Sequence, residues 1–154
     1  MTYNTSTKPE SKSNIGSRIL AGFIDYLIIY AFLFAYLYAY GQPDQDGVYS
    51  VSGLPALIPV LFWGLITIGI EQLFGSTIGN TIVGLKPISI NGISEKISFR
   101  QSLLRHLLDP IDMFFFGLVG ILTIQNSEKN QRVGDLAAKT IVVKVKDLKN
   151  LDKN

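Results

Sequence analysis

The chain has 154 residues, enough for one domain, and 47% of them are hydrophobic. A net charge of +2 is too small to indicate a nucleic-acid-binding protein, and no basic patch interleaved with aromatic residues occurs. The lack of cysteine excludes a disulfide framework and a thiolate site, and the single histidine, His106, excludes any site needing two imidazoles. We expect no nucleic-acid partner, no metal site and no cofactor.

The N-terminal residues 1–16 are polar and rich in Ser, Thr, Asn and Lys, which predicts a disordered tail. The following 22 residues, 19–40, contain one charge. At ~1.5 Å per residue such a helix crosses a hydrocarbon core of roughly 30 Å, so a membrane span is predicted at about 18–40. The apolar run is too long for a signal peptide and lacks a convincing small-residue cleavage site, which favours a retained anchor.

Two ionisable residues, Arg18 and Asp25, lie on this first span. Their separation of seven residues is nearly two turns, so both side chains share one helix face, about 10 Å apart along the axis. A carboxylate inside a membrane normally has a partner, and Arg18 is the nearest candidate. Asp25 therefore either binds a cation or proton, or forms a structural ion pair that fixes the helix orientation.

A second span is predicted at about 54–73, after a loop at 41–53 that contains no Lys or Arg. Residues 54–70 are uncharged, and Glu71 falls near the far end of the span. If the two spans are antiparallel, Glu71 lies on the same side of the membrane as Arg18.

Alternating apolar and polar residues at 85–90 and 93–98 flank Asn91-Gly92. Asn-Gly between alternating runs predicts a β-hairpin, because both residues tolerate positive φ. A third alternating run at 140–146 is expected to pair with this hairpin, which would be marginal alone. The fold class is thus an all-α membrane protein with a small cytoplasmic β element.

A third helical segment is predicted at about 100–125. Its first part is amphipathic and basic, Asp109-Pro110 breaks it, and the apolar run that follows at 113–124 has only 12 residues. This length is short for a span, so we expect the segment to re-enter the membrane; the alternative is a third full span.

Arg105, Asp109 and Asp112 follow one another at helical spacing on one face of this segment. They could line a polar cavity with Asp25 and Glu71, or belong to an interfacial helix whose charged face meets lipid headgroups. The amphipathic pattern favours the interfacial helix, and His106 is expected to be a surface or headgroup contact.

The cations predict the orientation. They are concentrated in the N-terminal tail, in the central stretch 86–105 and in the chain after residue 124, where seven Lys or Arg occur, including those of the polar tail 147–154. The positive-inside rule places all three regions, and so both termini, in the cytoplasm. A third full span would leave the last seven cations outside.

The chain resembles the RDD family of small bacterial membrane proteins, named for one arginine and two aspartates. The resemblance covers residues 17–146 as one membrane domain. It rests on four blocks in order: Arg18-Ile-Leu-Ala-Gly-Phe-Ile-Asp25, Thr77 to Lys86, Arg105 after an amphipathic run, and Gln131 to Val143. It implies that Arg18, Asp25 and Asp135 are the named residues and that the protein lies in the bacterial inner membrane. The chain departs from the family at Asn80, where a basic residue is usual, at Pro87, and at Gly134, where histidine is frequent.

Asp135 opens a short apolar run, so its carboxylate could cap a helix there. Alternatively, the Asp135 carboxylate could form an ion pair with Arg18 or Arg105 at the cytoplasmic side of the membrane domain. We expect Arg18, Asp25 and Asp135 to form one electrostatic unit.

The function expected from these observations is that of an integral membrane protein of transport type. By family resemblance, it moves or senses a cation or proton around Asp25. The alternative is a non-transporting accessory or scaffold subunit of a membrane complex. Two membrane spans and a re-entrant segment cannot readily enclose a transport pathway. Besides the lipid bilayer, we therefore expect a homo-oligomer or a larger membrane complex as the partner. No nucleophile elbow, phosphate loop or metal motif occurs, so the protein is not expected to be an enzyme.

Overall fold

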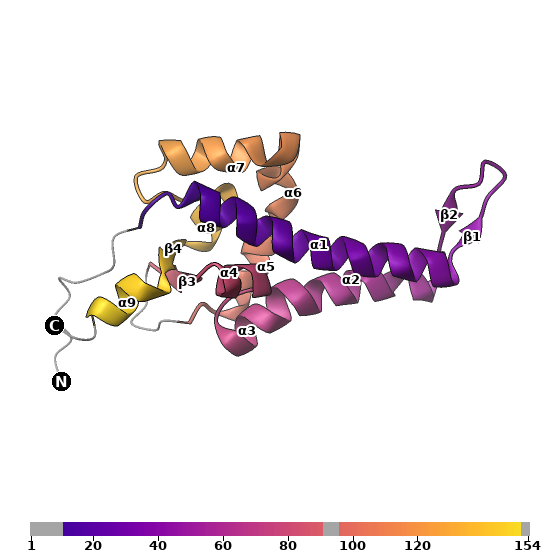
Figure 1. Cartoon of the computed structure of the whole chain (residues 1–154), viewed down its shortest axis with the longest axis horizontal. Helices are drawn as coiled ribbons and strands as arrows, with labels where there is room; N and C mark the ends of the chain where they lie inside the picture. Colours follow the sequence, from indigo (N-terminus) through magenta and orange to yellow (C-terminus); the bar gives the residue numbers. More distant parts are fainter. Residues whose placement is uncertain (1–10, 91–95, 152–154) are drawn as a thin grey trace.

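The computed structural model describes residues 11–90 and 96–151, and its shape is elongated (Figure 1). Two long antiparallel helical segments run side by side, with β1 and β2 at the tip that joins them, and the elements that follow α3 gather around the N-terminal half of the first segment. The helices are α1 (Ile15–Tyr40), η1 (Leu54–Ala56), α2 (Leu57–Gly64), η2 (Leu65–Gly69), α3 (Ile70–Phe74), α4 (Ile78–Ile82), α5 (Phe99–Leu107), α6 (Asp109–Asp112), α7 (Phe114–Asn126), α8 (Val133–Ala138) and α9 (Val145–Leu151). The strands are β1 (Gln42–Pro43), β2 (Tyr49–Ser50), β3 (Leu85–Ser89) and β4 (Thr140–Lys144).

Among the described residues, two helices are long and apolar enough to cross a membrane, which confirms the two predicted candidate spans. The first is α1, whose 26 residues give a length of about 39 Å. The second runs over Leu54–Phe74 and has 21 residues, about 31 Å. It is one continuous helical segment in which η2 is a π-helical stretch between α2 and α3.

The burial pattern is the reverse of that in a water-soluble protein. On α1 an apolar stripe is exposed, with Phe23 63%, Leu27 57%, Tyr30 51% and Phe34 68% accessible. Charged side chains are instead among the most buried residues of the chain, including Arg105 and Glu71 at 1%. An exposed apolar surface of this extent is costly in water and suits a lipid environment. The length of both helices, which matches the thickness of a bilayer, points to the same environment.

The outer arm, residues 32–62, joins the two helices by aromatic and polar contacts. The rings of Phe32 and Phe62 stack with centroids 3.8 Å apart, and the Tyr36 hydroxyl donates a hydrogen bond to the Pro55 carbonyl oxygen at 2.9 Å. At its tip β1 and β2 form a short antiparallel ladder that the sequence did not predict. Asp44 stabilises this turn, because its side chain accepts hydrogen bonds from two backbone N–H groups.

The predicted pairing of 85–90 with 140–146 is confirmed in its main part. β3 and β4 pair antiparallel, with Leu85 opposite Lys144 and Ser89 opposite Thr140. The Asn91-Gly92 turn lies outside the described residues, and residues 96–98 are not a strand. The expected strand ends earlier than predicted, since Val145 begins α9.

The third segment is interrupted beside the predicted Asp109-Pro110, which opens α6, but its sharp bend comes later, at Met113. α5 begins at a capping box, in which the Ser98 hydroxyl and the Gln101 side chain each accept a backbone N–H. α6 follows it, and the chain then bends by 115° into α7. Three consecutive residues after the bend, Phe115, Phe116 and Gly117, have left-handed backbone angles. Whether this bent pair re-enters or crosses the membrane stays a prediction.

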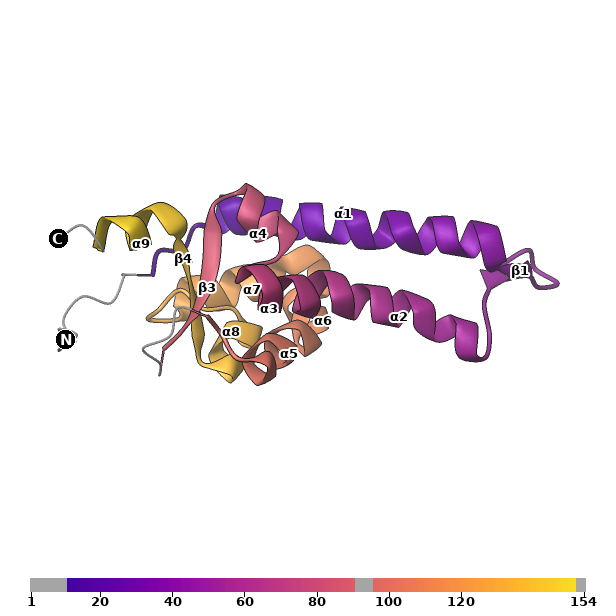
Figure 2. The ribbon, with the colours of Figure 1, turned by 90° about the horizontal axis from the view of Figure 1, so that it is seen from below.

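The body comprises the other described residues, and its elements approach one another closely where glycine allows it. Figure 2 shows α4 lying against the N-terminal half of α1. A Cβ on Gly79 of α4 would lie 2.0 Å from the Ala21 carbonyl oxygen of α1. On α8, a Cβ on Gly134 would lie 2.6 Å from the Arg105 carbonyl oxygen of α5. Only glycine fits at either place. The two contacts set how closely α4 approaches α1 and α8 approaches α5, and these helices carry or contact the buried charged residues.

Candidate functional site

Eight ionisable residues from five regions of the chain meet inside the body, and we call them the charged cluster. They come from α1, α3, α5, α6 and the start of α8. They are Arg18, Glu71, Arg105, His106, Asp109, Asp112, Arg132 and Asp135. Buried charges are stable only when they are paired and hydrogen-bonded, so the geometry of each pair matters.

Asp135 is the centre of the cluster and is fully buried. Its carboxylate lies 3.0 Å from Arg18 Nη1, 3.4 Å from Arg105 Nη1 and 3.7 Å from Arg132 Nε. Burial alone would raise the pKa of Asp135, but the guanidinium groups of Arg105, Arg132 and Arg18 outweigh it and hold that pKa below its usual range. The carboxylate is therefore ionised and holds three cations from separate elements together.

Arg132 stands at the N-cap of α8 and links Asp135 to α6. Its Nη1 lies 2.8 Å from Asp109 Oδ1, and its Nε lies 3.7 Å from Asp112 Oδ2. Burial alone would lower the pKa of Arg132, but the surrounding carboxylates, Asp109 first, raise it above its ordinary value. Arg132 is a permanent positive charge in this setting.

Glu71, at the end of the second candidate span, meets α5. Its carboxylate lies 3.6 Å from Arg105 Nη2 and 3.3 Å from His106 Nε2, and it accepts a hydrogen bond from the Ser102 hydroxyl. The other ring nitrogen of His106, Nδ1, lies 2.9 Å from Asp109 Oδ2. His106 thus lies between two carboxylates from different elements.

Asp112 has a mainly architectural set of contacts. Its two carboxylate oxygens accept hydrogen bonds from the backbone N–H groups of Val133 at 2.8 Å and Gly134 at 3.1 Å. These N–H groups begin α8 and have no partner within the helix, so Asp112 caps α8 from α6. The close approach of Gly134 to α5 allows this contact.

Asp25 lies apart from these pairs. Its Oδ1 accepts a hydrogen bond of 2.7 Å from the backbone N–H of Gly79, near the start of α4. Among the described residues it makes no ion pair, so the expected pairing with Arg18 is wrong. The reason is geometric: Arg18 reaches Asp135 and the Asn130 carbonyl oxygen instead, while Gly79 brings α4 against Asp25.

A cavity of about 430 Å³ joins Asp25 to the charged cluster. α5, α6 and the start of α8 contribute charged side chains to it, and α1 and α7 contribute mainly apolar and aromatic ones. The polar and charged residues that line it are Arg18, Asp25, Tyr26, Tyr30, Thr67, Thr77, Asn80, Arg105, His106, Asp109, Asp112 and Arg132. A concave site with a few convergent polar groups is the usual form of a small-ligand site.

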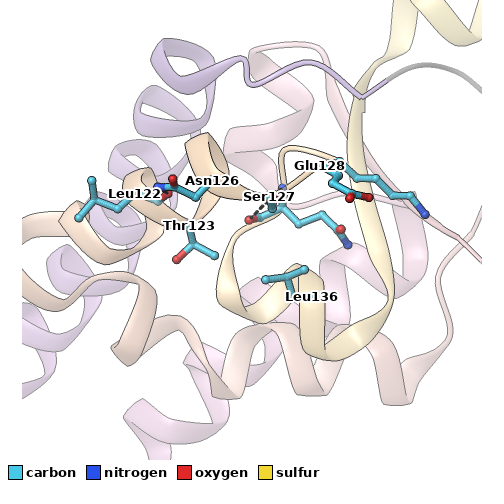
Figure 3. Close-up of a pocket in the computed structure, with 8 residues that line it drawn as sticks. Leu122, Thr123, Asn126, Ser127, Glu128 and Leu136 are labelled. Carbon is cyan, nitrogen blue, oxygen red and sulfur yellow. Dashed lines mark hydrogen bonds between the residues drawn. The ribbon is translucent and has the colours of Figure 1, made fainter.

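A separate hollow of about 670 Å³ lies beside the C-terminal half of α7, the turn after it and α8 (Figure 3). Leu122, Thr123 and Asn126 of α7 line it, together with Leu136 of α8. No member of the charged cluster lines this hollow. It is therefore a weaker candidate for an ion-binding site than the cavity at Asp25.

The structure brings together most of the residues that the sequence singled out. Arg18, Glu71, Arg105, Asp109, Asp112 and Asp135 all belong to the charged cluster, and Asp25 shares the cavity with it. The favoured interpretation of α5 and α6 as an interfacial helix with its charges at headgroups is wrong, because these charges are buried. His106 is likewise not a surface residue, being 4% exposed. The two alternatives for Asp135 both hold, since it also accepts the Arg132 N–H at the start of α8.

Sequence reasoning missed Arg132 altogether. A signal was present, because Arg132 precedes Asp135 by three residues in the same block, the spacing at which a side chain of the first helical turn meets the N-cap. Among the described residues, no group of three or more His, Asp or Glu side chains is arranged to hold a metal ion. The charged cluster is therefore a set of mutual ion pairs, and the neighbouring carboxylate of Asp25 takes no part in them.

Comparison with known proteins assigns the chain to a family. The profile of the RDD family matches residues 12–139, which is most of the chain and includes every member of the charged cluster as well as Asp25. No curated protein and no solved structure matches the chain. With two apolar helices of membrane-spanning length and a family match over this range, the chain belongs to the RDD family.

Proposed function

We propose that the protein is an integral membrane protein of transport type that takes up a monovalent cation or a proton at Asp25. One observation carries the proposal: Asp25 lines the cavity of about 430 Å³, and among the described residues it has no cationic partner. A carboxylate in a membrane helix that is not neutralised by a protein cation is a natural site for a proton or a small cation.

The charges around the cavity support a cation and not an anion. Among the described residues, the cluster and Asp25 together contribute five carboxylates against three guanidinium groups and one imidazole. Even with His106 protonated, one negative charge remains unbalanced. A monovalent ion or a proton brings the single positive charge that Asp25 lacks, which fits this cavity better than a divalent metal.

The proposed setting is the bacterial inner membrane, with several passes and both termini in the cytoplasm. It is supported by the cation distribution and by the last helix, α9, which lies near the N-terminal end of α1 (Figure 2). Labelling single cysteines in the cysteine-free chain tests it. Cysteines at 4, 45, 92 and 150 should react with an impermeant reagent from outside only at 45, in the loop between the spans. External reaction at 150 would show that the bent α5–α7 segment crosses the membrane.

The alternative, an accessory or scaffold subunit, is favoured by a different observation. Two membrane-spanning helices cannot enclose a pathway, so transport by this chain needs a homo-oligomer or a partner. If the chain only assembles a complex, the buried charges would serve to fix its fold.

Ion flux in proteoliposomes decides between the two. We expect a sodium or potassium gradient to drive proton movement in vesicles that hold wild-type protein, and Asp25→Asn to reduce it at least about tenfold. Asparagine keeps a carbonyl oxygen for the Gly79 N–H, so this variant should still fold, and detergent melting checks that. Asp46→Asn, at an exposed carboxylate in the outer loop, is the matched control and should leave flux unchanged. Absence of flux in both the wild type and Asp25→Asn would support the accessory role.

A further inference from the structure

His106 occupies a position that the proposed cation site at Asp25 does not explain. Its Nδ1 is hydrogen-bonded to Asp109 Oδ2 at 2.9 Å, and its Nε2 lies 3.3 Å from Glu71 Oε2, within ion-pair distance but without hydrogen-bond geometry. The three side chains are almost completely buried, with 4% exposure for His106 and Asp109 and 1% for Glu71. They come from α5, α6 and α3, so tertiary packing holds the imidazole between the acids.

The hydrogen-bonding capacity of imidazole restricts what this arrangement can contain. A neutral histidine has one N–H group and one lone pair, so only one of its two nitrogens can donate to a carboxylate. The other nitrogen would then place its lone pair against an ionised oxygen in a buried, weakly screened site. An imidazolium has N–H groups on both nitrogens and a charge that attracts both acids.

The surrounding charges do not remove the need for this proton. Arg105 approaches the other carboxylate oxygen of Glu71, Oε1, and Arg132 approaches the other oxygen of Asp109, Oδ1, so each acid already has one guanidinium partner. Both guanidinium groups also approach Asp135, and Arg132 approaches Asp112 as well. The cations are thus shared among more carboxylates than they can neutralise.

We propose that Glu71, His106 and Asp109 form a proton-binding site, in which His106 is an imidazolium at neutral pH and releases its proton when a monovalent cation occupies the cavity beside Asp25. The bound proton follows from the contacts of these three residues alone. Its release by a cation rests on the proposed function, since it requires a cation at Asp25.

The exchange is balanced in charge and atoms. A cation adds one positive charge to the cavity, and one proton leaves a ring nitrogen of His106 for water, so the net charge of the site is unchanged. No other bond forms or breaks, and nothing is oxidised or reduced. His106, Asp109 and Asp25 all line the same cavity, which gives the proton and the cation a common compartment.

Linkage requires the effect to be reciprocal. If a cation at Asp25 weakens proton binding at His106, the proton must weaken cation binding by the same factor. Cation affinity should therefore rise with pH through the range in which His106 loses its proton. Replacing His106 with asparagine should give, at neutral pH, the tighter cation binding that the wild type reaches only after His106 has lost its proton, and it should remove the part of the pH dependence that comes from His106.

The single histidine makes the proton directly observable. Protein labelled with ¹⁵N-histidine and held in lipid nanodiscs gives one imidazole, whose two nitrogen signals report its protonation state. Without added cation, in choline chloride, we expect an imidazolium at neutral pH, whereas an exposed histidine titrates near about 6.5. Asp109→Asn should shift the loss of the proton to lower pH, and Asp46→Asn should not shift it. A neutral imidazole in wild-type protein at neutral pH would overturn the proposal.

Adding sodium or potassium chloride to the same sample tests the release. We expect the imidazolium signals of the wild type to convert to those of a neutral ring, and those of Asp25→Asn to stay unchanged. If flux is measured but the imidazolium persists at saturating cation, the exchange is overturned while the cation site stands. If a cation converts the imidazole equally in Asp25→Asn, the proposed site at Asp25 is wrong, and so is the exchange as stated here.

Discussion

The outer arm and the body of this protein are built on opposite principles. The outer arm, residues 32–62, contains two charged residues, Asp44 and Asp46, both exposed in the loop. Its helices meet through stacked rings and a tyrosine hydrogen bond. The body buries five carboxylates, which must find partners within the protein. Contacts in the arm are replaceable by lipid, whereas those in the body are not, because lipid cannot solvate a charge.

This contrast predicts the largest effect at Asp135. The Asp135→Asn variant leaves Arg18, Arg105 and Arg132 without their common carboxylate, and breaking a buried pair costs about 3–5 kcal/mol. We expect a strong loss of folded protein, measured by expression in the membrane and by thermal unfolding in detergent. Asp44→Asn in the arm removes only an exposed charge, since asparagine keeps an oxygen for the two turn N–H groups; it is the comparison variant and should cost far less. Equal losses in the two variants would mean that the body does not depend on its charges.

A pair of glycines, both in the body, compares a close packing contact with an open position on a helix. Gly79→Ala would place a methyl group 2.0 Å from the Ala21 carbonyl oxygen and disturb the contact of α4 with Asp25. We expect a loss of about 1–3 kcal/mol in the free energy of unfolding. Gly64→Ala in α2 meets nothing within 4 Å and lies in a helix, so it should be neutral or stabilising by up to about 1 kcal/mol. Melting temperatures in one detergent compare them directly, and a destabilised Gly64→Ala would contradict this.

A double-mutant cycle sharpens the assignment within the body. Arg18→Gln and Asp135→Asn should be coupled by about 0.5–3 kcal/mol, because the two side chains are 3.0 Å apart. The cycle of Arg18→Gln with Asp25→Asn should be nearly additive, because these residues have different partners. Unfolding of the four proteins of each cycle gives the coupling. A stronger coupling of Arg18 to Asp25 than to Asp135 would restore the pairing that sequence spacing suggested.

Acid should weaken the body gradually. The pKa of Asp135 is held below that of an unfolded aspartate, about 3.9, so its stabilising contribution is complete above that value and is lost as pH falls through the folded pKa. We expect the difference in melting temperature between wild type and Asp135→Asn to be constant near neutrality and to shrink below about pH 4. A difference that grows on acidification would show that Asp135 is protonated in the folded protein.

The smallest effect is expected in the arm. Phe32→Ala removes the stack with Phe62, and an aromatic pair contributes about 0.5–1.5 kcal/mol beyond its buried area. In a membrane, lipid chains can fill part of the space that the ring leaves. Unfolding in nanodiscs should therefore show a loss well below that of Asp135→Asn. A loss of similar size would mean that the arm has a packed core of its own.

The sequence by itself determined the parts of the fold that depend on local pattern. The length and apolar character of residues 18–40 and 54–73 specify two membrane-length helices, because an unbroken apolar run of that size has few other stable environments. Alternation at 85–90 and 140–146 predicted the two segments that contain the paired strands β3 and β4, and Asp109-Pro110 predicted the interruption after α5. The short β1–β2 ladder escaped prediction, because two residues a strand leave no periodic signal.

Tertiary structure decided which charges meet. Helix spacing placed Arg18 and Asp25 on one face, yet Arg18 pairs with Asp135, 117 residues away, and Asp25 accepts a hydrogen bond from α4. The amphipathic face of α5 and α6 is compatible with headgroups and with a buried cluster alike, since periodicity shows that a face is polar but not what covers it. α8 covers it, because Gly134 lets that helix approach the Arg105 backbone and Asp112 caps its first turn. Ion pairing depends on distances between segments remote in the chain, which no local pattern contains.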